Sequence, residues 1–237
     1  MFGHPHLHLR ITDSTNDRAR DLAEAGAPSG AVVTAGEQRA GRGRRGRVWS
    51  APPAAALLYS ALIRPLELEH VLLPLAVPVA VCEAVESLAP VECRIKWPND
   101  VWIDEAKVAG ILIEARPPDW AVLGVGVNIA IAPAEFPSDL RWPATSIGHG
   151  VTVDEARDAL SAALGEWAEA PEQSVLEAFR ERDALLGRDV AWEGDGRGGG
   201  SGVADGIDDR GNLVVELEGG ERRSLGSGEV SLRIGRS

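Results

Sequence analysis

The chain carries a dense run of arginine and glycine at residues 41–49, which reads Gly-Arg-Gly-Arg-Arg-Gly-Arg-Val-Trp, with Arg39 just before it. Arginine is always charged, and its planar fork of donors suits phosphate and carboxylate oxygens. Glycine lets the backbone fold closely over a ligand. Because like charges this close repel, we expect a loop that is mobile when empty and ordered when an anion fills it. A solvated basic loop and a nucleic-acid patch remain alternatives for this stretch taken alone.

Lysine is nearly absent, since only Lys96 and Lys107 among the 24 basic residues are lysines. Both lie in apolar surroundings, where a compact ammonium acts differently from a forked guanidinium. An arginine-rich codon usage is the alternative explanation. Lys96 opens the segment Lys-Trp-Pro-Asn-Asp, which ends in the carboxylate Asp100. Positive charges aimed at phosphate oxygens, one acid and the exclusion of water are what phosphoryl or nucleotidyl transfer needs.

Other chemistries lack their sequence patterns. The chain has no GxxxxGK[ST] pattern, no Ser-His-Asp order, no Cys-His pair and no zinc-ligand spacing. The alternating His4, His6 and His8 are interpreted as solvated residues of a strand rather than as metal ligands. These observations argue against a P-loop enzyme, a covalent hydrolase and a metalloenzyme.

Composition narrows the class of partner and the compartment. The 237 residues carry a net charge of −12, and an acidic chain binds nucleic acid poorly because the phosphates repel it. We therefore expect a small anionic ligand rather than a duplex. No apolar run reaches the ~18 residues of a membrane span, and the N-terminus lacks a signal-peptide pattern. Cys82 and Cys93 are expected to be reduced core residues of a cytoplasmic protein.

Hydrophobic periodicity predicts a first part that mixes strands and helices. A strand at 6–11 precedes a helix that Asp13-Ser14-Thr15-Asn16 caps and that ends near Gly26. Short loops between successive strands predict an antiparallel meander. Further strands are expected at 31–36, 56–64, 91–96, 101–103, 107–115 and 120–129, and further helices at 68–89 (delayed or kinked by Pro74 and Pro78), 153–170 and 172–186.

The composition changes after Gly187. Short β segments alternate with turns at 189–192, 202–207, 213–217, 222–225 and 229–234, while residues 194–202 are glycine-rich and expected to form a loose loop. Five short strands of this kind resemble an SH3-like barrel. We therefore expect two domains, residues 1–186 and residues 187–237.

Three glycines interrupt neighbouring strands of the predicted meander. Gly110, Gly124 and Gly126 each weaken a strand unless a ligand or another backbone comes close. We interpret them as the place where a ligand lies on the sheet, with β-bulges as the alternative.

Together these segments resemble the ordered motifs of the biotin–protein ligases (biotin–acetyl-CoA-carboxylase ligases). The resemblance spans nearly the whole chain, and it is carried by Ser14-Thr15-Asn16, residues 38–49, Lys96–Asp100, Lys107–Leu112, Gly124–Asn128 and the C-terminal residues 206–233. It implies an α+β fold, in which a mixed, largely antiparallel sheet is flanked by helices (a class II synthetase-like catalytic domain) beside an SH3-like C-terminal barrel.

The resemblance also implies a two-step reaction. The carboxylate of biotin attacks the α-phosphate of ATP, in the presence of Mg²⁺, to give biotinyl-5′-AMP and pyrophosphate. A lysine of a biotin carboxyl carrier domain of an acyl-CoA carboxylase then displaces AMP.

The resemblance also implies roles for individual residues. Biotin would be bound by Ser14, Thr15, Asn16, Gln38, Arg42, Gly43, Arg44, Lys107, Gly110 and Gly124. ATP and the adenylate would be bound by Arg44, Arg47, Trp49, Lys96, Asn99, Gly126 and Asn128. Catalysis would rest on Lys107, Arg44, Arg42 and Asp100. Asp100 is interpreted as the group that accepts a proton from the incoming amine or orients it, with a plain turn residue as the alternative and Lys96 as its charge partner.

Many relatives carry an N-terminal helix-turn-helix, and the early first strand here leaves no room for one. We therefore expect neither nucleic-acid binding nor repressor activity, no membrane association, and a monomer or a weak homodimer. A lipoate or octanoyl ligase is the nearest alternative, and the arginine loop and the Lys-Trp-Pro-Asn-Asp segment argue against it. A module that docks nucleic acid or phosphopeptide is the alternative from a different class.

Overall fold

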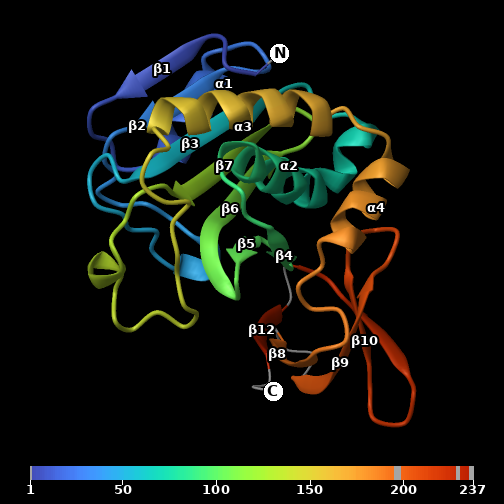
Figure 1. Ribbon diagram of the computed structural model, residues 1–237. Coiled ribbons are helices and arrows are strands. Elements are labelled where there is room, and N and C mark those ends of the chain that lie inside the picture. Colours follow the sequence, from blue (N-terminus) through green and yellow to red (C-terminus); the bar gives the residue numbers. More distant parts are fainter. Residues whose placement is uncertain (1, 195–198, 228–229, 235–237) are drawn as a thin grey trace.

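The computed structural model describes residues 2–194, 199–227 and 230–234. Its first part is a seven-stranded sheet in the order β1-β2-β3-β7-β6-β5-β4 (Figure 1). The strands are β1 (His6–Leu9), β2 (Val32–Ala35), β3 (Ala56–Ile63), β4 (Arg94–Lys96), β5 (Asp100–Ile103), β6 (Ala106–Arg116) and β7 (Trp120–Asn128). β1 pairs with β2 in parallel and every other pair is antiparallel, which confirms the predicted meander.

Helices cover both faces of this sheet. Alternate residues of β3, such as Tyr59 and Ala61, share one core cluster with α2 (Leu73–Leu88) and α3 (Val153–Trp167). Leu62 points the other way and packs with Ala19 and Ala23 of α1 (Thr15–Glu24). The period of two along a strand produces this division. The face that α1 shares also holds Leu58 and Ser60, and it is where the cavity described below lies.

Most of helix α2 is buried in this core. The 3-10 helix η2 (Leu68–Leu72) precedes it, so the helix starts late, as Pro74 in its first turn predicted. By length and composition the stretch His70–Leu88 could cross a membrane, but 67% of its most apolar window is buried inside the protein. Such burial is what a core helix shows.

The C-terminal strands form a second sheet of five antiparallel strands, in the order β11-β10-β9-β8-β12. They are β8 (Asp189–Gly194), β9 (Gly200–Ile207), β10 (Leu213–Glu216), β11 (Arg222–Leu225) and β12 (Val230–Ile234). Figure 1 shows this unit below α4 (Glu172–Glu181) and beside β4. Trp97 Nε1 donates to the Gly211 carbonyl at 3.0 Å, which ties the two parts together. The predicted fold class is confirmed.

Several predicted boundaries were wrong. Helix α4 ends at Glu181 rather than at 186, and β4 covers only residues 94–96. Residues 200–202 belong to β9 rather than to a loose loop, and residues 195–198 of that predicted loop lie outside the described residues. Ser14 occupies the N-cap position of α1 but its side chain makes no capping bond. Gln38 takes that role, because its Oε1 accepts from the Thr15 backbone N–H at 2.7 Å.

Candidate functional site

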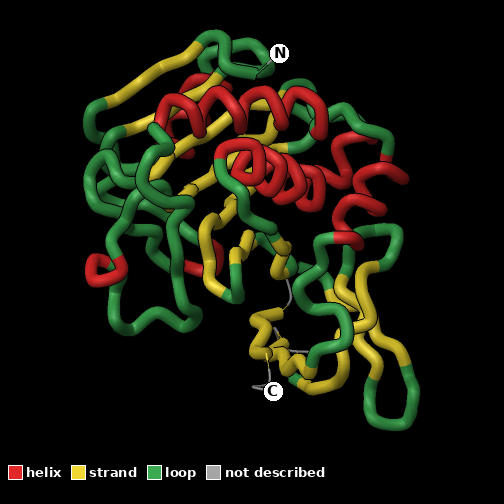
Figure 2. Tube along the Cα trace, viewed as in Figure 1, coloured by secondary structure: helices red, strands yellow, loops and turns green. Residues whose placement is uncertain are grey.

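A cavity of about 560 Å³ opens on the α1 side of the sheet. Strands β3, β6 and β7 form its floor, and the arginine loop, the start of α1 and the long connection between β7 and α3 form its walls. Figure 2 shows that this long connection is mostly loop, with one short helical turn. Among the predicted site residues it is lined by Ser14, Thr15, Asn16, Gln38, Arg42, Gly43, Arg44, Arg47, Trp49, Asn99, Asp100, Lys107, Gly110, Gly124, Gly126 and Asn128. Lys96 does not line it.

Strand register brings these segments together. Leu58 pairs with Gly126, Gly126 with Gly110, Gly110 with Asp100, and Asp100 with Lys96, so one row crosses five strands. Since residues in register on adjacent strands lie side by side, the glycines become the floor and Asp100 becomes its end wall.

The part of the cavity nearest α1 is a chain of polar contacts. Gln38 Oε1 accepts from Thr15 Oγ1 at 3.1 Å, and Ser60 Oγ donates to Asn16 Oδ1 at 2.6 Å. The same Ser60 oxygen lies 2.8 Å from Thr15 Oγ1. Thr15, Asn16 and Ser60 are buried. Buried polar groups that are satisfied in this way hold a fixed orientation, so this end can read the hydrogen-bonding pattern of a polar ring.

The three strand glycines make room for side chains of the protein itself. A Cβ on Gly124 would lie 2.2 Å from Asn16 Oδ1, and a Cβ on Gly126 would lie 2.4 Å from Trp49 Cε2. A Cβ on Gly110 would lie 2.9 Å from both Lys107 Nζ and the Trp49 ring. The glycines therefore seat the Trp49 indole and the Asn16 amide, and a ligand would lie against these groups. The buried Trp49 Nε1–H has no hydrogen-bond partner among the described residues, so it can serve a ligand acceptor.

At the other end, Asp100 lies between the two lysines of the chain. Lys107 Nζ is 2.6 Å from Asp100 Oδ1, and Lys96 Nζ is 4.0 Å from Oδ2. Asp100 is 2% exposed, whereas the Lys107 side chain is 24% exposed and reaches into the cavity. Lys96 is buried behind Asp100, with its ammonium 5.9 Å from the Trp102 ring and 5.5 Å from the Trp142 ring. The geometry thus makes Lys96 the predicted charge partner of Asp100.

Burial of the Lys96 ammonium lowers the stability of the fold by an amount that depends on pH. Desolvation, opposed by Asp100 and reinforced by Lys107, lowers the pKa of Lys96 to about 8 from its ordinary value of 10.5. The unfolded chain then binds more protons than the folded protein between pH 8 and 10.5, so the contribution of Lys96 to stability rises with pH across that window.

Lys96→Met is expected to remove this pH dependence. The difference in the free energy of unfolding, wild type minus variant, should increase from about pH 7.5 to about pH 10, because only the wild type is relieved of a buried charge. Urea unfolding at several pH values measures it. A difference that stays flat or falls with pH would contradict the burial of a charged Lys96.

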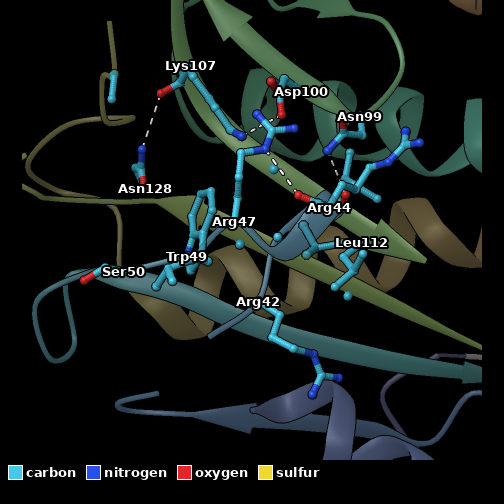
Figure 3. A pocket seen from close by; sticks show the side chains of 18 of the residues that line it. Arg42, Arg44, Arg47, Trp49, Ser50, Asn99, Asp100, Lys107, Leu112 and Asn128 are labelled. Carbon is cyan, nitrogen blue, oxygen red and sulfur yellow. Dashed lines mark hydrogen bonds and ion pairs between the residues drawn. The ribbon is translucent and has the colours of Figure 1, made fainter. Parts of the chain in front are cut away.

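The arginines of the loop point in different directions (Figure 3). Arg47 extends toward the end of the cavity that holds Asp100 and Lys107, and its Nε donates to the Arg44 carbonyl at 3.2 Å. Arg44 donates to the backbone carbonyl of Ser227 in the C-terminal part, so the loop touches both parts of the molecule. Burial, followed by the charges of Arg45 and Arg47, lowers the pKa of Arg44. An anion entering here would compensate crowded positive charge.

Arg42 points away from Asp100 and toward α1. Its guanidinium binds Asp17 Oδ1 at 2.7 Å and Glu114 at 3.1–3.2 Å. Sequence reasoning missed both carboxylates, because no local pattern links residues 17, 42 and 114. Their pairing arises only when β6 and α1 pack beside the loop.

Sequence reasoning also missed the wall between β7 and α3. Phe136, Leu140, Arg141 and Trp142 line the cavity from this segment, which contains only the short 3-10 helix η3 (Pro133–Glu135). Asn128 anchors the segment, since its Nδ2 donates to the carbonyls of Lys107 at 3.3 Å and Thr145 at 3.0 Å. Asn99 similarly donates to the Ile111 carbonyl at 3.0 Å. The aromatic and proline content of residues 136–143 was the available signal.

Comparison with known proteins gives a consistent result. The profile of the Biotin/lipoate A/B protein ligase family matches residues 8–128, and that of the Biotin protein ligase C terminal domain matches residues 185–233. The biotin–[acetyl-CoA-carboxylase] ligase of Paracoccus denitrificans is 36% identical over 94% of this chain and 98% of its own length. The bifunctional ligase/repressor BirA of Bacillus subtilis is 34% identical over 66% of this chain, and the match spans half of BirA.

A solved structure extends the similarity to three dimensions. The biotin protein ligase of Aquifex aeolicus in complex with biotin and ATP superposes with a TM-score of 0.79 at 28% identity, over 98% of this chain and 100% of that one. The similarity in three dimensions thus extends over both sheets. The chain belongs to the biotin protein ligases of the biotin/lipoate A/B protein ligase family.

Proposed function

We propose that the protein is an ATP-dependent biotin–protein ligase. It forms biotinyl-5′-AMP from biotin and ATP and then transfers biotin to a lysine of a biotin carboxyl carrier domain of an acyl-CoA carboxylase. The observation that carries the proposal is the cavity itself, whose polar end is built by Thr15, Asn16 and Gln38 and whose cationic end is built by Lys107 and Arg47. The similarity to a ligase that binds biotin and ATP supports it.

The polar end suits the ring system of biotin. A ureido group carries two N–H donors, and the Thr15–Ser60–Asn16 network presents hydroxyl and amide oxygens that can accept from them. Ser14, Gln38, Gly43, Gly110 and Gly124 complete the proposed biotin site.

The cationic end suits the meeting of two anions. The biotin carboxylate must approach a phosphate, and two like charges about 4 Å apart repel by about 1 kcal/mol in water and several times more at lower dielectric. Lys107, Arg44 and Arg47 offset that repulsion where the bond forms. Arg42 is proposed to contribute as well, although here its guanidinium binds Asp17 and Glu114. Closure of the loop would keep water from the reactive anhydride.

The nucleotide is proposed to lie against Trp49, Asn99, Gly126 and Asn128. Mg²⁺ would arrive with ATP and be held largely by phosphate oxygens and water, as is usual for this ion. In the second step the carrier amine attacks the acyl carbon, the bond to the phosphate oxygen breaks and AMP leaves. Asp100, which lines the cavity, is proposed to orient that amine or to accept its proton.

We further propose that residues 1–186 are the catalytic domain and residues 187–237 a C-terminal domain. The protein is proposed to act in the cytoplasm, where ATP is available, as a monomer or weak homodimer that binds no nucleic acid. The two free, buried cysteines fit a reducing compartment.

The direct test measures pyrophosphate release from ATP and Mg²⁺ with biotin or with lipoate. Release that depends on biotin, followed by labelling of a carrier domain lysine, is expected. Release with lipoate alone would establish a lipoate ligase instead. No release with either, together with salt-sensitive oligonucleotide binding, would support a nucleic-acid-binding module.

Gly126→Ala is expected to weaken ATP binding by about 5- to 150-fold, since an aromatic platform for a base contributes roughly 1–3 kcal/mol. The new Cβ would lie 2.4 Å from Trp49 and would push the indole off the sheet. Titration calorimetry measures the loss. Gly165→Ala in α3 is the matched control, because nothing lies within 4 Å of its Cβ position. Equal ATP affinity for Gly126→Ala and the wild type would contradict the role of Trp49.

A further inference from the structure

Glu114 on β6 contacts two parts of the site at once, the Asn16 amide and the Arg42 guanidinium. Its Oε2 accepts from Asn16 Nδ2 at 2.7 Å, and both its oxygens lie 3.1–3.2 Å from Arg42 Nη2. Its side chain is 32% exposed. One carboxylate therefore binds both the buried polar end of the cavity and Arg42 of the arginine loop.

The contact fixes the orientation of the Asn16 amide. Nδ2 donates to Glu114 and, at 3.3 Å, to the Leu112 carbonyl, while Oδ1 accepts from Ser60 at 2.6 Å. Both amide hydrogens are thereby used and one lone pair of Oδ1 is left for a ligand donor. A flipped amide would set its oxygen against the Glu114 carboxylate and the Leu112 carbonyl, which is unfavourable because all of these oxygens are acceptors. Glu114 thus decides which group Asn16 presents.

The same carboxylate fixes one end of the loop. Arg42 binds Glu114 from β6 and Asp17 from α1, so its guanidinium bridges two elements that are distant in sequence. Trp49, seated on Gly126 and Gly110, fixes the other end. The residues between these two anchors include Arg44 and Arg47, whose positions depend on where the anchors hold the backbone.

We propose that Glu114 is a positioning residue for the ligase reaction, which orients Asn16 for biotin and holds the arginine loop beside it through Arg42. This proposal rests on the proposed function. It assigns to the Glu114 side chain an effect on both the affinity for biotin and the retention of the adenylate. Glu114→Gln and Glu114→Ala are expected to change these two properties differently.

Glu114→Gln keeps an acceptor for Asn16 but loses the charge that binds Arg42. We expect biotinyl-5′-AMP to dissociate about tenfold faster, a change worth ~1.4 kcal/mol, with the KM for biotin changed less than about threefold. Glu114→Ala loses both contacts, so the KM for biotin should also rise about tenfold. Adenylate loss is followed by chasing labelled biotinyl-5′-AMP from the protein, and KM and kcat are taken from pyrophosphate release.

Arg42→Ala tests the route through the loop. It should speed adenylate loss as Glu114→Gln does, and the double variant should lose adenylate no faster than either single variant, because residues that act as one unit are not additive. Asp21→Asn is the matched control, since it breaks an exposed ion pair with Arg18 on the same helix as Asn16 and lies outside the cavity.

Additive effects of Glu114→Gln and Arg42→Ala, or equal KM values for Glu114→Gln and Glu114→Ala, would overturn the proposal. If Glu114→Ala does not fold, the comparison of Glu114→Gln with Arg42→Ala decides. A wild type that releases no pyrophosphate with biotin would overturn the proposed function, and this inference with it. An active wild type whose Glu114 variants match Asp21→Asn would overturn this inference alone.

Discussion

Lys107→Ala is expected to lower biotin-dependent pyrophosphate release by about 10²–10³-fold, the effect of removing one preorganised donor from a site of charge development. The Lys107 ammonium lies 2.6 Å from Asp100 and 5.4 Å from the Trp49 ring, at the end of the cavity where the biotin carboxylate and the α-phosphate would meet. Without it, the repulsion between the two anions is no longer offset there. Pyrophosphate release at saturating biotin and ATP measures the loss.

Two comparisons make this result specific. Arg116→Ala removes another cation from the same strand, but its side chain is 65% exposed and pairs with Asp119 at the surface, so activity should match the wild type. Lys107→Arg keeps the charge but replaces a point donor with a larger planar fork, so it should recover only part of the rate. Normal pyrophosphate release by Lys107→Ala would exclude the proposed role.

Asp100→Asn is expected both to lower the stability of the protein strongly and to slow the transfer of biotin to the carrier lysine. Asp100 and Lys96 are both almost fully buried, with side-chain exposures of 4% and 7%. Removing one partner of a buried ion pair typically costs about 3–5 kcal/mol, because an uncompensated charge remains. Lys107 can turn toward water and Lys96 cannot, so Lys96 carries the penalty.

A second substitution separates the two effects. In Asp100→Asn/Lys96→Met the unpaired buried charge is gone, so thermal unfolding should return toward the wild-type temperature. Transfer of biotin from preformed biotinyl-5′-AMP to a carrier domain should remain slow in both variants, because the group that orients the amine is still absent. A double variant no more stable than the single one would show that Lys96 does not depend on Asp100. Normal transfer by the single variant would exclude Asp100 from the second step.

Local sequence features predicted most of the framework. The strand pattern at 101–129 with its short turns predicted an antiparallel meander, and β5, β6 and β7 form one. The helix predicted at 153–170 begins at Val153, where Thr152 and Glu155 form a capping box. These features succeed because strand alternation, turn residues and helix caps act over only a few residues. The ends of α4 and β4 were less well predicted, since packing against neighbouring elements decides where an element stops.

The cavity shows where local reasoning ends. The motif resemblance named sixteen residues that line it, but it placed Lys96 beside them, whereas the register Lys96–Asp100 puts that lysine behind the carboxylate. It gave no indication that Gln38 caps α1 or that Glu114 binds Arg42. These contacts join residues 23 to 72 positions apart, and no short window of sequence contains both partners.

The chemical groups of the site follow from residue types alone: a cationic, glycine-rich loop, two lysines with one carboxylate, and glycines on adjacent strands, because residue type sets charge, size and backbone freedom. Which of these groups line the cavity, and which are buried away from it, depends on the tertiary structure. Folding made one lysine a wall of the cavity and buried the other, turned Arg42 toward α1, and filled the space above the glycines with Trp49 and Asn16. Strand register and helix packing fix the distance between residues remote in sequence, and electrostatic interactions depend on that distance.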